Sequence, residues 1–176
     1  EMTCRPLQAA LVVAGLALLA GCSTAPPAPL ADSAPPLASP LPTPAAPPVV
    51  LQARNDVALF ALSLLDTPYT RGGRGPATGF DCSGLVNHVY ARAAGVKLGG
   101  TSAQLGQKTR RVDARERQPG DLVFFNTLGE SYSHVGVYVG NGRFVHASNP
   151  RTGVRVDRLD NRYWAERLEG VHRVLE

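Results

Sequence analysis

Apolar residues are spaced three and four apart over residues 52–65 and again from Cys82 to Gly95, as on one face of a helix. Residues 121–125, 133–139 and 143–148 are instead rich in β-branched and aromatic side chains, and Pro-Gly and Gly-Asn-Gly turns bound them. The pattern therefore predicts two amphipathic helices followed by strands, and the last two of these strands form a hairpin.

The composition of residues 1–53 differs from that of the remaining chain. These residues contain no aromatic side chain and hold all but four of the fifteen prolines. Residues 23–50 are mostly proline and alanine, with Asp32 as their only charge, so they cannot bury enough apolar surface to fold. We therefore expect a tether over residues 22–50 and one globular domain over residues 51–176, which is long enough for a single core.

The first 21 residues have the features of an export signal. Arg5 precedes an apolar run, Leu7 to Leu19, that has the length of a signal-peptide core and is too short to span a bilayer as a mature helix. The run ends in Leu-Ala-Gly-Cys22, which resembles the lipobox of bacterial lipoproteins. That resemblance implies a lipid anchor on Cys22 and, since Ser23 follows instead of aspartate, a place on the periplasmic face of the outer membrane. The alternative is an ordinary signal peptide that happens to carry a cysteine.

Processing of this kind would leave Cys82 as the one unmodified thiol, because Cys4 would leave with the signal peptide and Cys22 would carry lipid. Asp81 is a candidate N-cap of the helix that begins at Cys82, and the N–H groups of Cys82 and Ser83 are candidates for an oxyanion hole. We expect the helix start to lower the pKa of the thiol. Taken alone, Cys82 would be better explained as a small buried hydrophobe.

The predicted hairpin carries two histidines, His134 and His146. If Asn141 and Gly142 form a strict two-residue loop, the two rings point to opposite faces of the sheet. A three-residue loop, with a type I turn and Gly142 in the left-handed region, instead brings His146 opposite Gly136 and places both rings on one face. We predict the three-residue loop.

A shared face gives each side chain a chemical role. Cys82 is the candidate nucleophile, His134 the base, and His146 the group that holds the other ring nitrogen of His134. Each histidine taken separately could be a strand residue with a satisfied hydrogen bond, but the combination with Cys82 favours catalysis. His88 and His172 are predicted to lie on the surface.

Four motifs then occur in the order typical of one family. They are Asp81–Val86, Pro119–Phe125, His134–Tyr138 and Phe144–Ser148. With these motifs, nearly all of residues 55–176 resembles the NlpC family of papain-like cell-wall cysteine peptidases. The resemblance implies an α+β, papain-like fold in which N-terminal helices pack on a central antiparallel sheet. It also implies a catalytic set of Cys82, His134 and His146, with Tyr69 beside the nucleophile.

The family resemblance implies hydrolysis of peptide stems or cross-links in peptidoglycan through a thioester, with no metal or other cofactor. Residues 101–104 look like the short helix that follows the nucleophile helix in the family, and Thr101 with Gln104 forms a capping box. Gly99 and Gly100 stand before it where relatives often have an arginine, which leaves the substrate subsites open.

Three rival functions remain at this level. The same nucleophile could serve an amidase or acyltransferase, since a fold does not fix a reaction. The chain could also be a catalytically silent wall-binding lipoprotein, or hold zinc, although no CxxC or HxxxH spacing occurs. The net charge of +4 and pI near 9.3 suit peptidoglycan, nucleic acid and anionic lipid equally. From the motifs we expect peptidoglycan as partner, no nucleic acid, and a monomer.

Overall fold

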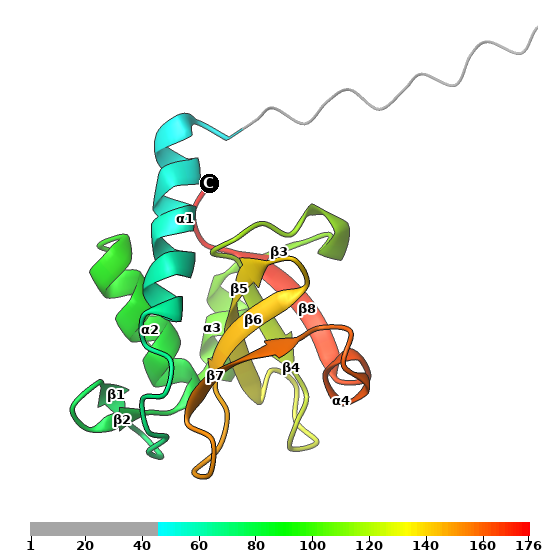
Figure 1. The fold of residues 1–176 in the computed structure, drawn as a ribbon. Coiled ribbons are helices and arrows are strands. Elements are labelled where there is room, and N and C mark those ends of the chain that lie inside the picture. Colours follow the sequence, from blue (N-terminus) through cyan, green and yellow to red (C-terminus); the bar gives the residue numbers. More distant parts are fainter. Residues whose placement is uncertain (1–45) are drawn as a thin grey trace, which may run out of the picture. The chain divides into compact units, whose positions relative to one another are not determined.

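The computed structural model describes residues 46–176, whose backbone is drawn in colour in Figure 1. The signal peptide expected at residues 1–21, the lipid anchor expected at Cys22 and most of the expected tether lie outside the described residues. No helix within residues 46–176 is long and apolar enough to cross a membrane.

The first helix begins earlier than its apolar pattern predicts. Helix α1 spans Pro48–Leu62, whereas the pattern indicated residues 52–65. Proline has a fixed φ and no N–H, so it suits the first turn of a helix, where the N–H has no partner within the helix. Residues 48–50, which composition alone placed in the tether, therefore form the first turn of α1.

The other helices are short and have defined starts. Helix α2 spans Cys82–Ala93, and helix α3 spans Ser102–Lys108 behind the predicted capping box of Thr101 and Gln104. A two-stranded ribbon of β1 (Arg74–Gly75) and β2 (Gly79–Phe80) precedes α2. A 3-10 turn at Ala114–Glu116 and helix α4 at Arg162–Ala165 complete the helical elements of the described residues.

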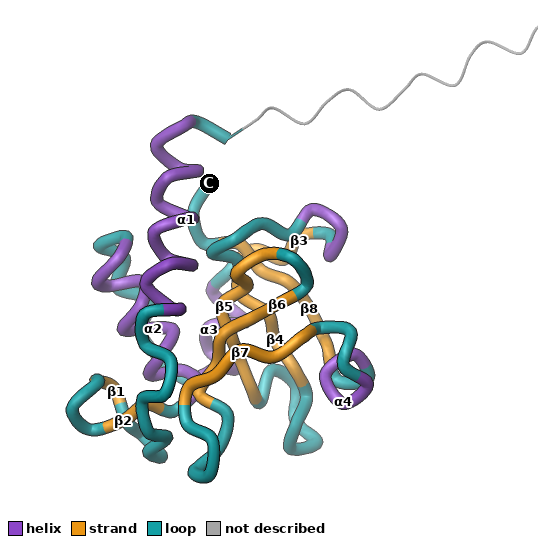
Figure 2. The backbone as a smooth tube through the Cα atoms, in the orientation of Figure 1, coloured by secondary structure: helices purple, strands orange, loops and turns teal. Residues whose placement is uncertain are grey.

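A six-stranded antiparallel sheet forms the other half of the domain, in the order β3-β8-β4-β5-β6-β7. The strands are β3 (Arg110–Val112), β4 (Leu122–Phe125), β5 (His134–Gly140), β6 (Arg143–Ala147), β7 (Val154–Arg158) and β8 (Leu168–Arg173). Figures 1 and 2 show α1 and α2 together on one side of this sheet. The expected α+β class, with helices packed on an antiparallel sheet, is confirmed.

Both faces of the sheet are covered, because alternate residues of its strands point to opposite sides. The larger core lies between the sheet and helices α1 to α3 and includes Val57, Leu85, Leu105, Phe124 and Val135. A second core on the opposite face joins the sheet to α4 and contains Phe125, Phe144 and Trp164. His134 and His146 belong to this second face, where their rings contact Trp164.

The hairpin of β5 and β6 has the predicted register but not the predicted turn. Tyr138 pairs with Phe144, and this register continues to set His146 opposite Gly136. The loop is nevertheless a two-residue turn in which Asn141 and the following glycine have φ of 53° and 70°, so the predicted type I turn is wrong. A bulge between Tyr138 and Gly140 supplies the extra residue within the strand, which has the same effect on register as a longer loop.

Candidate active site

Asp81 fixes the start of the helix that carries Cys82. One carboxylate oxygen accepts the N–H of Gly84 at 2.6 Å and the hydroxyl of Ser83 at 3.0 Å, so the predicted N-cap is present. The other oxygen accepts the N–H of Gly72 at 2.9 Å. The carboxylate therefore ties the glycine-rich loop to the first turn of α2 and holds Cys82 at the helix start.

Close backbone packing sets the position of this helix start. A Cβ atom added to Gly84 would lie 1.9 Å from the carbonyl oxygen of Gly73, and one added to Gly73 would lie 2.4 Å from that of Gly79. Tyr69 forms a bridge with Phe80 in the same loop and lines the hollow that contains Cys82. Tyr69 thus lies on the nucleophile side of the site, where the family resemblance expected it.

The electrostatic environment of Cys82 differs from the prediction. Burial, followed by the negative charge of Asp81, raises the pKa of the thiol to about 11. Hydrogen bonds from the backbone of Val135, Ser83 and Cys82 itself act in the opposite direction but are outweighed. The expectation of a lowered pKa was wrong because it counted the helix start and omitted the burial and the neighbouring carboxylate.

Cys82 nevertheless lies next to the strand that carries the histidines. One of the backbone groups that bond its sulfur belongs to Val135, the residue after His134. In the described part of the chain, no hydrogen bond joins the thiol to the His134 ring. Catalytic hydrogen bonds of unliganded enzymes are often long and tighten only when substrate binds.

The two histidines of the hairpin are in direct contact. Nε2 of His134 lies 2.8 Å from Nδ1 of His146, and the two rings are perpendicular. His134 also stacks on Trp164, with ring centroids 5.5 Å apart. The predicted shared face is therefore present, and it leaves Nδ1 as the free nitrogen of the His134 ring.

Asp157 extends this pair to a third member that the sequence reasoning missed. Its Oδ2 lies 2.9 Å from Nε2 of His146, and its Oδ1 accepts a hydrogen bond from Arg155 at 2.8 Å. Phe144 pairs with Asp157 across β6 and β7, which makes Asp157 a diagonal neighbour of His146. The alternating residues 154–158 were the available signal, since they read as one more strand beside β6.

Both histidines are neutral at neutral pH. Burial, and to a smaller extent the neighbouring His146, lowers the pKa of His134 to about 3. Burial also lowers the pKa of His146, although the carboxylate of Asp157 opposes the change. A neutral imidazole has one unprotonated nitrogen, so His134 is able to accept a proton from the thiol.

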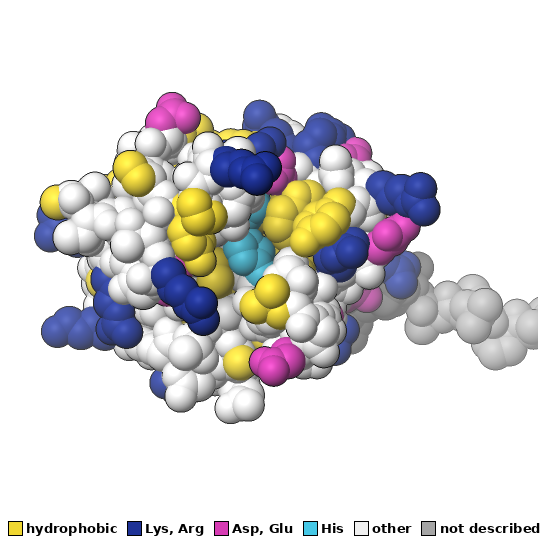
Figure 3. Space-filling model, turned by 90° about the horizontal axis from the view of Figure 1, so that it is seen from below, with side chains coloured by type: hydrophobic (Ala, Val, Ile, Leu, Met, Phe, Trp, Pro, Cys, Tyr) yellow, Lys and Arg dark blue, Asp and Glu magenta, His cyan; other side chains and the backbone are white. Residues whose placement is uncertain are grey.

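Two hollows meet at this site. The first is lined by Cys82, Tyr69, Arg71 and Glu130, and the second by His134, Ser148 and Trp164; Leu128 borders both. Figure 3 shows histidine side chains at the floor of a depression between hydrophobic groups. The arrangement suits an extended chain that lies across the thiol and the imidazole.

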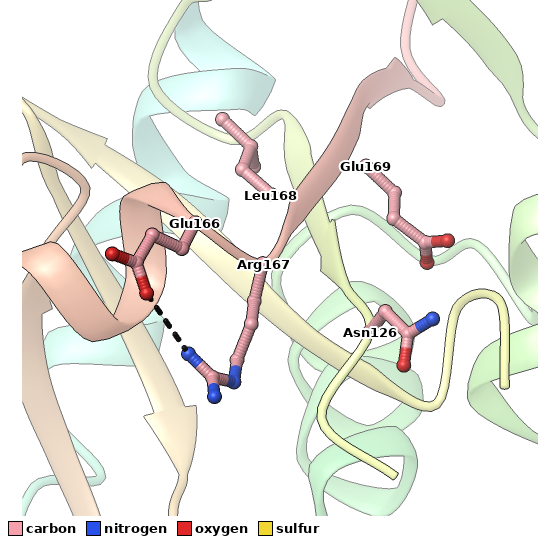
Figure 4. Close-up of a pocket in the computed structure, with 5 residues that line it drawn as sticks. All are labelled: Asn126, Glu166, Arg167, Leu168 and Glu169. Atoms are coloured by element: carbon pink, nitrogen blue, oxygen red, sulfur yellow. Dashed lines mark ion pairs between the residues drawn. The ribbon is translucent and has the colours of Figure 1, made fainter. Parts of the chain in front are cut away.

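A further hollow on the same domain lacks the groups for such chemistry. It is lined by Asn126, Glu166, Arg167, Leu168 and Glu169, and Figure 4 shows the ion pair of Glu166 with Arg167 beside it. Its lining includes neither a thiol nor an imidazole. Within residues 46–176, no group of three or more His, Cys, Asp or Glu side chains is arranged to hold a metal ion.

The remaining histidines are less exposed than predicted. His88 packs against the rings of Phe60 and Phe80, because α1 covers the side of α2 that the helical pattern left open to solvent. His172 is only 2% exposed and bonds Thr109, because its strand lies inside the sheet between β3 and β4. Neither ring lines the two hollows that meet at Cys82 and His134.

Comparisons with known proteins agree with this geometry. The model of the NlpC/P60 family matches residues 66–173. The murein DD-endopeptidase MepH of Escherichia coli (strain K12) is 40% identical over 131 residues, which are 71% of this chain and 48% of that protein. The bifunctional muramidase/DL-endopeptidase CwlT of Bacillus subtilis (strain 168) is 39% identical over 116 residues, 65% of this chain and 34% of that protein.

A solved structure gives the same relationship. The peptidoglycan hydrolase RipB from Mycobacterium tuberculosis aligns with a TM-score of 0.62 and 31% sequence identity. The alignment covers 74% of this chain and 69% of that chain. The chain spans less than half the length of the two curated relatives, so their full activities do not transfer with the matched domain.

Proposed function

This chain belongs to the NlpC/P60 family, and on that premise we propose that it is a peptidoglycan hydrolase, a cysteine endopeptidase that cuts peptide cross-links or stem peptides of the cell wall. One observation carries the proposal. The Cys82 thiol, at the start of a helix, adjoins a strand whose histidine is held by a second histidine. Nucleophile, base and orienting group are the parts that covalent acyl transfer requires.

In the proposed reaction, Cys82 gives its thiol proton to Nδ1 of His134 as the sulfur attacks the carbonyl carbon of a peptide bond. N–H groups at the start of α2, those of Cys82 and Ser83, stabilise the resulting oxyanion. Collapse of this intermediate breaks the C–N bond, and His134 returns the proton to the departing amine. Water then gives a proton to His134 and attacks the thioester, which releases the carboxylate product and restores the thiol.

The cleft supports a peptide substrate with charged groups. Arg71 and Glu130 line the hollow on the thiol side, and the exposed side chain of Leu128 stands where the two hollows meet. The relatives carry names that denote DD- and DL-endopeptidases of the wall, which cut different bonds. The proposed substrates are therefore wall peptides as a class, and analysis of the products identifies which peptide bond is cut.

We also propose that the chain is a lipoprotein of the outer membrane, held on its periplasmic face through Cys22 as a monomer. The support is in the sequence: a lipobox-like Leu-Ala-Gly-Cys22, Ser23 after it, and the proline-rich residues up to α1. At about 3.1 Å per residue, a tether of this length would reach on the order of 80 Å if extended, enough to present the domain away from a membrane. Labelling of the chain by palmitate, lost in Cys22→Ser, tests the anchor.

The function is tested with purified sacculi. The chain is incubated with them and the released fragments are identified by mass spectrometry, with Cys82→Ala as the matched control. New termini at cross-links identify an endopeptidase that acts between stems, and shortened stems identify one that acts within them. Release of whole stems from the glycan would identify an amidase, and binding without release would identify a silent wall-binding protein; either result overturns the proposal.

A further inference from the structure

In the hydrogen bonds that join Asp157, His146 and His134, the donor and the acceptor of each bond can be assigned. Asp157 is an acceptor on both oxygens, since Arg155 donates to one and Nε2 of His146 faces the other. An ionised carboxylate has no proton to give, so Nε2 of His146 must carry the hydrogen. The side chain of Asp157 is 20% exposed. Burial acts to raise its pKa, but the hydrogen bond and charge of His146, then the charge of Arg155 and a hydrogen bond from Trp164, hold that pKa below the usual value.

That hydrogen sets the tautomers of both rings. A neutral imidazole carries one hydrogen, so Nδ1 of His146 is left with a lone pair. This lone pair faces Nε2 of His134 at 2.8 Å, which must then be the protonated nitrogen of that ring. Nδ1 of His134 is left unprotonated, as a base must be.

We propose that Asp157 is a positioning residue that fixes the tautomers of His146 and His134, so that His134 offers an unprotonated Nδ1 to the thiol. This inference rests on the proposed cysteine mechanism. Without the carboxylate, the opposite arrangement becomes open, in which Nδ1 of His146 donates to His134 and the base nitrogen carries a hydrogen. The groups that face the His146–Asp157 pair are His134 from β5, Phe144 from β6, Arg155 from β7 and Trp164 from α4.

Arg155 makes the asparagine substitution a sharp test. Because Arg155 donates to Oδ1, the carbonyl oxygen in Asp157→Asn turns toward it, and the amide NH₂ turns toward Nε2 of His146. Two N–H groups cannot face each other, so Nε2 of His146 loses its hydrogen and both tautomers reverse. In the Ser-His-Asp triad, the equivalent Asp→Asn change costs about 10⁴-fold in kcat through the wrong tautomer.

The relative effects of two substitutions on kcat distinguish a positioning role of Asp157 from a purely structural one. Asp157→Asn is expected to lower kcat on sacculi by about 100-fold, the scale of a lost general base. Asp157→Ala, which leaves both tautomers open, is expected to lower kcat less. Asp160→Asn is the matched control, because Asp160 pairs with Arg158 on the exposed end of the same strand and is expected to leave kcat unchanged. A purely structural role predicts the reverse order, since asparagine preserves the shape that alanine removes, and that order overturns the proposal.

A spectroscopic measurement keeps this test independent of activity. Nitrogen-15 NMR of the histidine rings reports which nitrogen of each is protonated. In the unaltered chain we expect hydrogen on Nε2 of both His134 and His146, and in Asp157→Asn on Nδ1 of both. Hydrogen on Nδ1 of His134 in the unaltered chain overturns the inference even if no variant folds. Absence of sacculus cleavage with the expected tautomers would instead contradict the proposed function alone.

Discussion

Nε2 of His134 lies 2.8 Å from Nδ1 of His146, although the two residues stand on neighbouring strands and twelve positions apart. The contact depends on the register of the β5–β6 hairpin, since a slip of one residue would turn one ring to the other face of the sheet. The bulge between Tyr138 and Gly140 sets that register. A local irregularity in a strand thus determines whether the two imidazoles can act together.

Gly136 provides the space for this contact, and filling it should disrupt the pair. In Gly136→Ala, the new Cβ would lie 2.7 Å from the ring of Phe144, 2.9 Å from the carbonyl oxygen of Val145 and 3.2 Å from Cβ of His146. We expect the free energy of unfolding to fall by about 1–3 kcal/mol, as for other overpacked sites, and sacculus cleavage to fall with it. Urea unfolding and fragment release measure the two effects.

Gly75→Ala is the control for this substitution, because the nearest atom to its new Cβ lies 3.9 Å away. It should leave stability and activity close to those of the unaltered chain. If Gly136→Ala behaves as Gly75→Ala does, the space opposite His146 has no role.

The buried neutral histidines make stability depend on pH. The pKa of His134 is about 3 in the folded chain and has an ordinary value of 6.5, so the unfolded chain binds the proton first as pH falls. The stabilisation is complete above pH 6.5 and is lost progressively as pH falls toward 3. We expect Tm to fall steadily between pH 6.5 and 4, and to fall less steeply in His134→Phe, which has no proton to bind. A Tm that is flat over this range would contradict the burial of neutral histidines.

Asp81 raises the pKa of the thiol, and removing its charge should lower it. In Asp81→Asn, the amide oxygen keeps the cap on Gly84, while one hydrogen bond to the loop at Gly72 is lost. The rate of Cys82 alkylation by iodoacetamide should therefore reach half its maximum at a lower pH than in the unaltered chain. Asp113→Asn removes a capping carboxylate from the remote 3-10 turn and should leave the profile in place. An unchanged profile in Asp81→Asn would show that burial alone sets the pKa.

Arg173 and Asp121 form a buried ion pair that joins the last strand to the turn before β4. The two hydrogen bonds between them measure 3.0 Å and 2.8 Å, and the Asp121 side chain is 2% exposed. Arg173→Met would leave a buried unpaired carboxylate, which costs about 3–5 kcal/mol. Arg110→Met, which breaks the exposed pair with Glu176, is the control and should change urea unfolding little. Equal effects of the two substitutions would contradict the difference in burial.

The sequence was sufficient where the local pattern determines the structure. The apolar spacing after Cys82 predicted α2, and Asp81 at its start predicted the cap, because a helix N-terminus needs an acceptor at that position. The alternation on either side of Asn141 predicted the hairpin. The predicted three-residue loop gave the observed register, although the structure reaches that register through a bulge in β5. The proline pair at the start of α1 hid an earlier helix start, because proline is common both in tethers and in first turns.

The features that the sequence did not reveal depend on tertiary contacts. The pKa of Cys82 is raised because the sheet buries the thiol, and no local pattern reports how deeply a helix start is buried. His172 was predicted on the surface because its neighbours β3 and β4 are far from it in the chain. Asp157 was missed because it lies on β7, a strand that the motifs do not contain, and contacts His146 of β6 only diagonally.

The most direct test of Cys82 as the nucleophile compares the unaltered chain with Cys82→Ala and Cys82→Ser on the same preparation of sacculi, with soluble peptide fragments measured over time. Alanine removes the thiol, and serine offers a hydroxyl in its place with little change in shape. The cysteine mechanism predicts fragments from the unaltered chain and none above buffer from either variant, while circular dichroism shows all three folded. Fragment release by Cys82→Ala at the rate of the unaltered chain would contradict it.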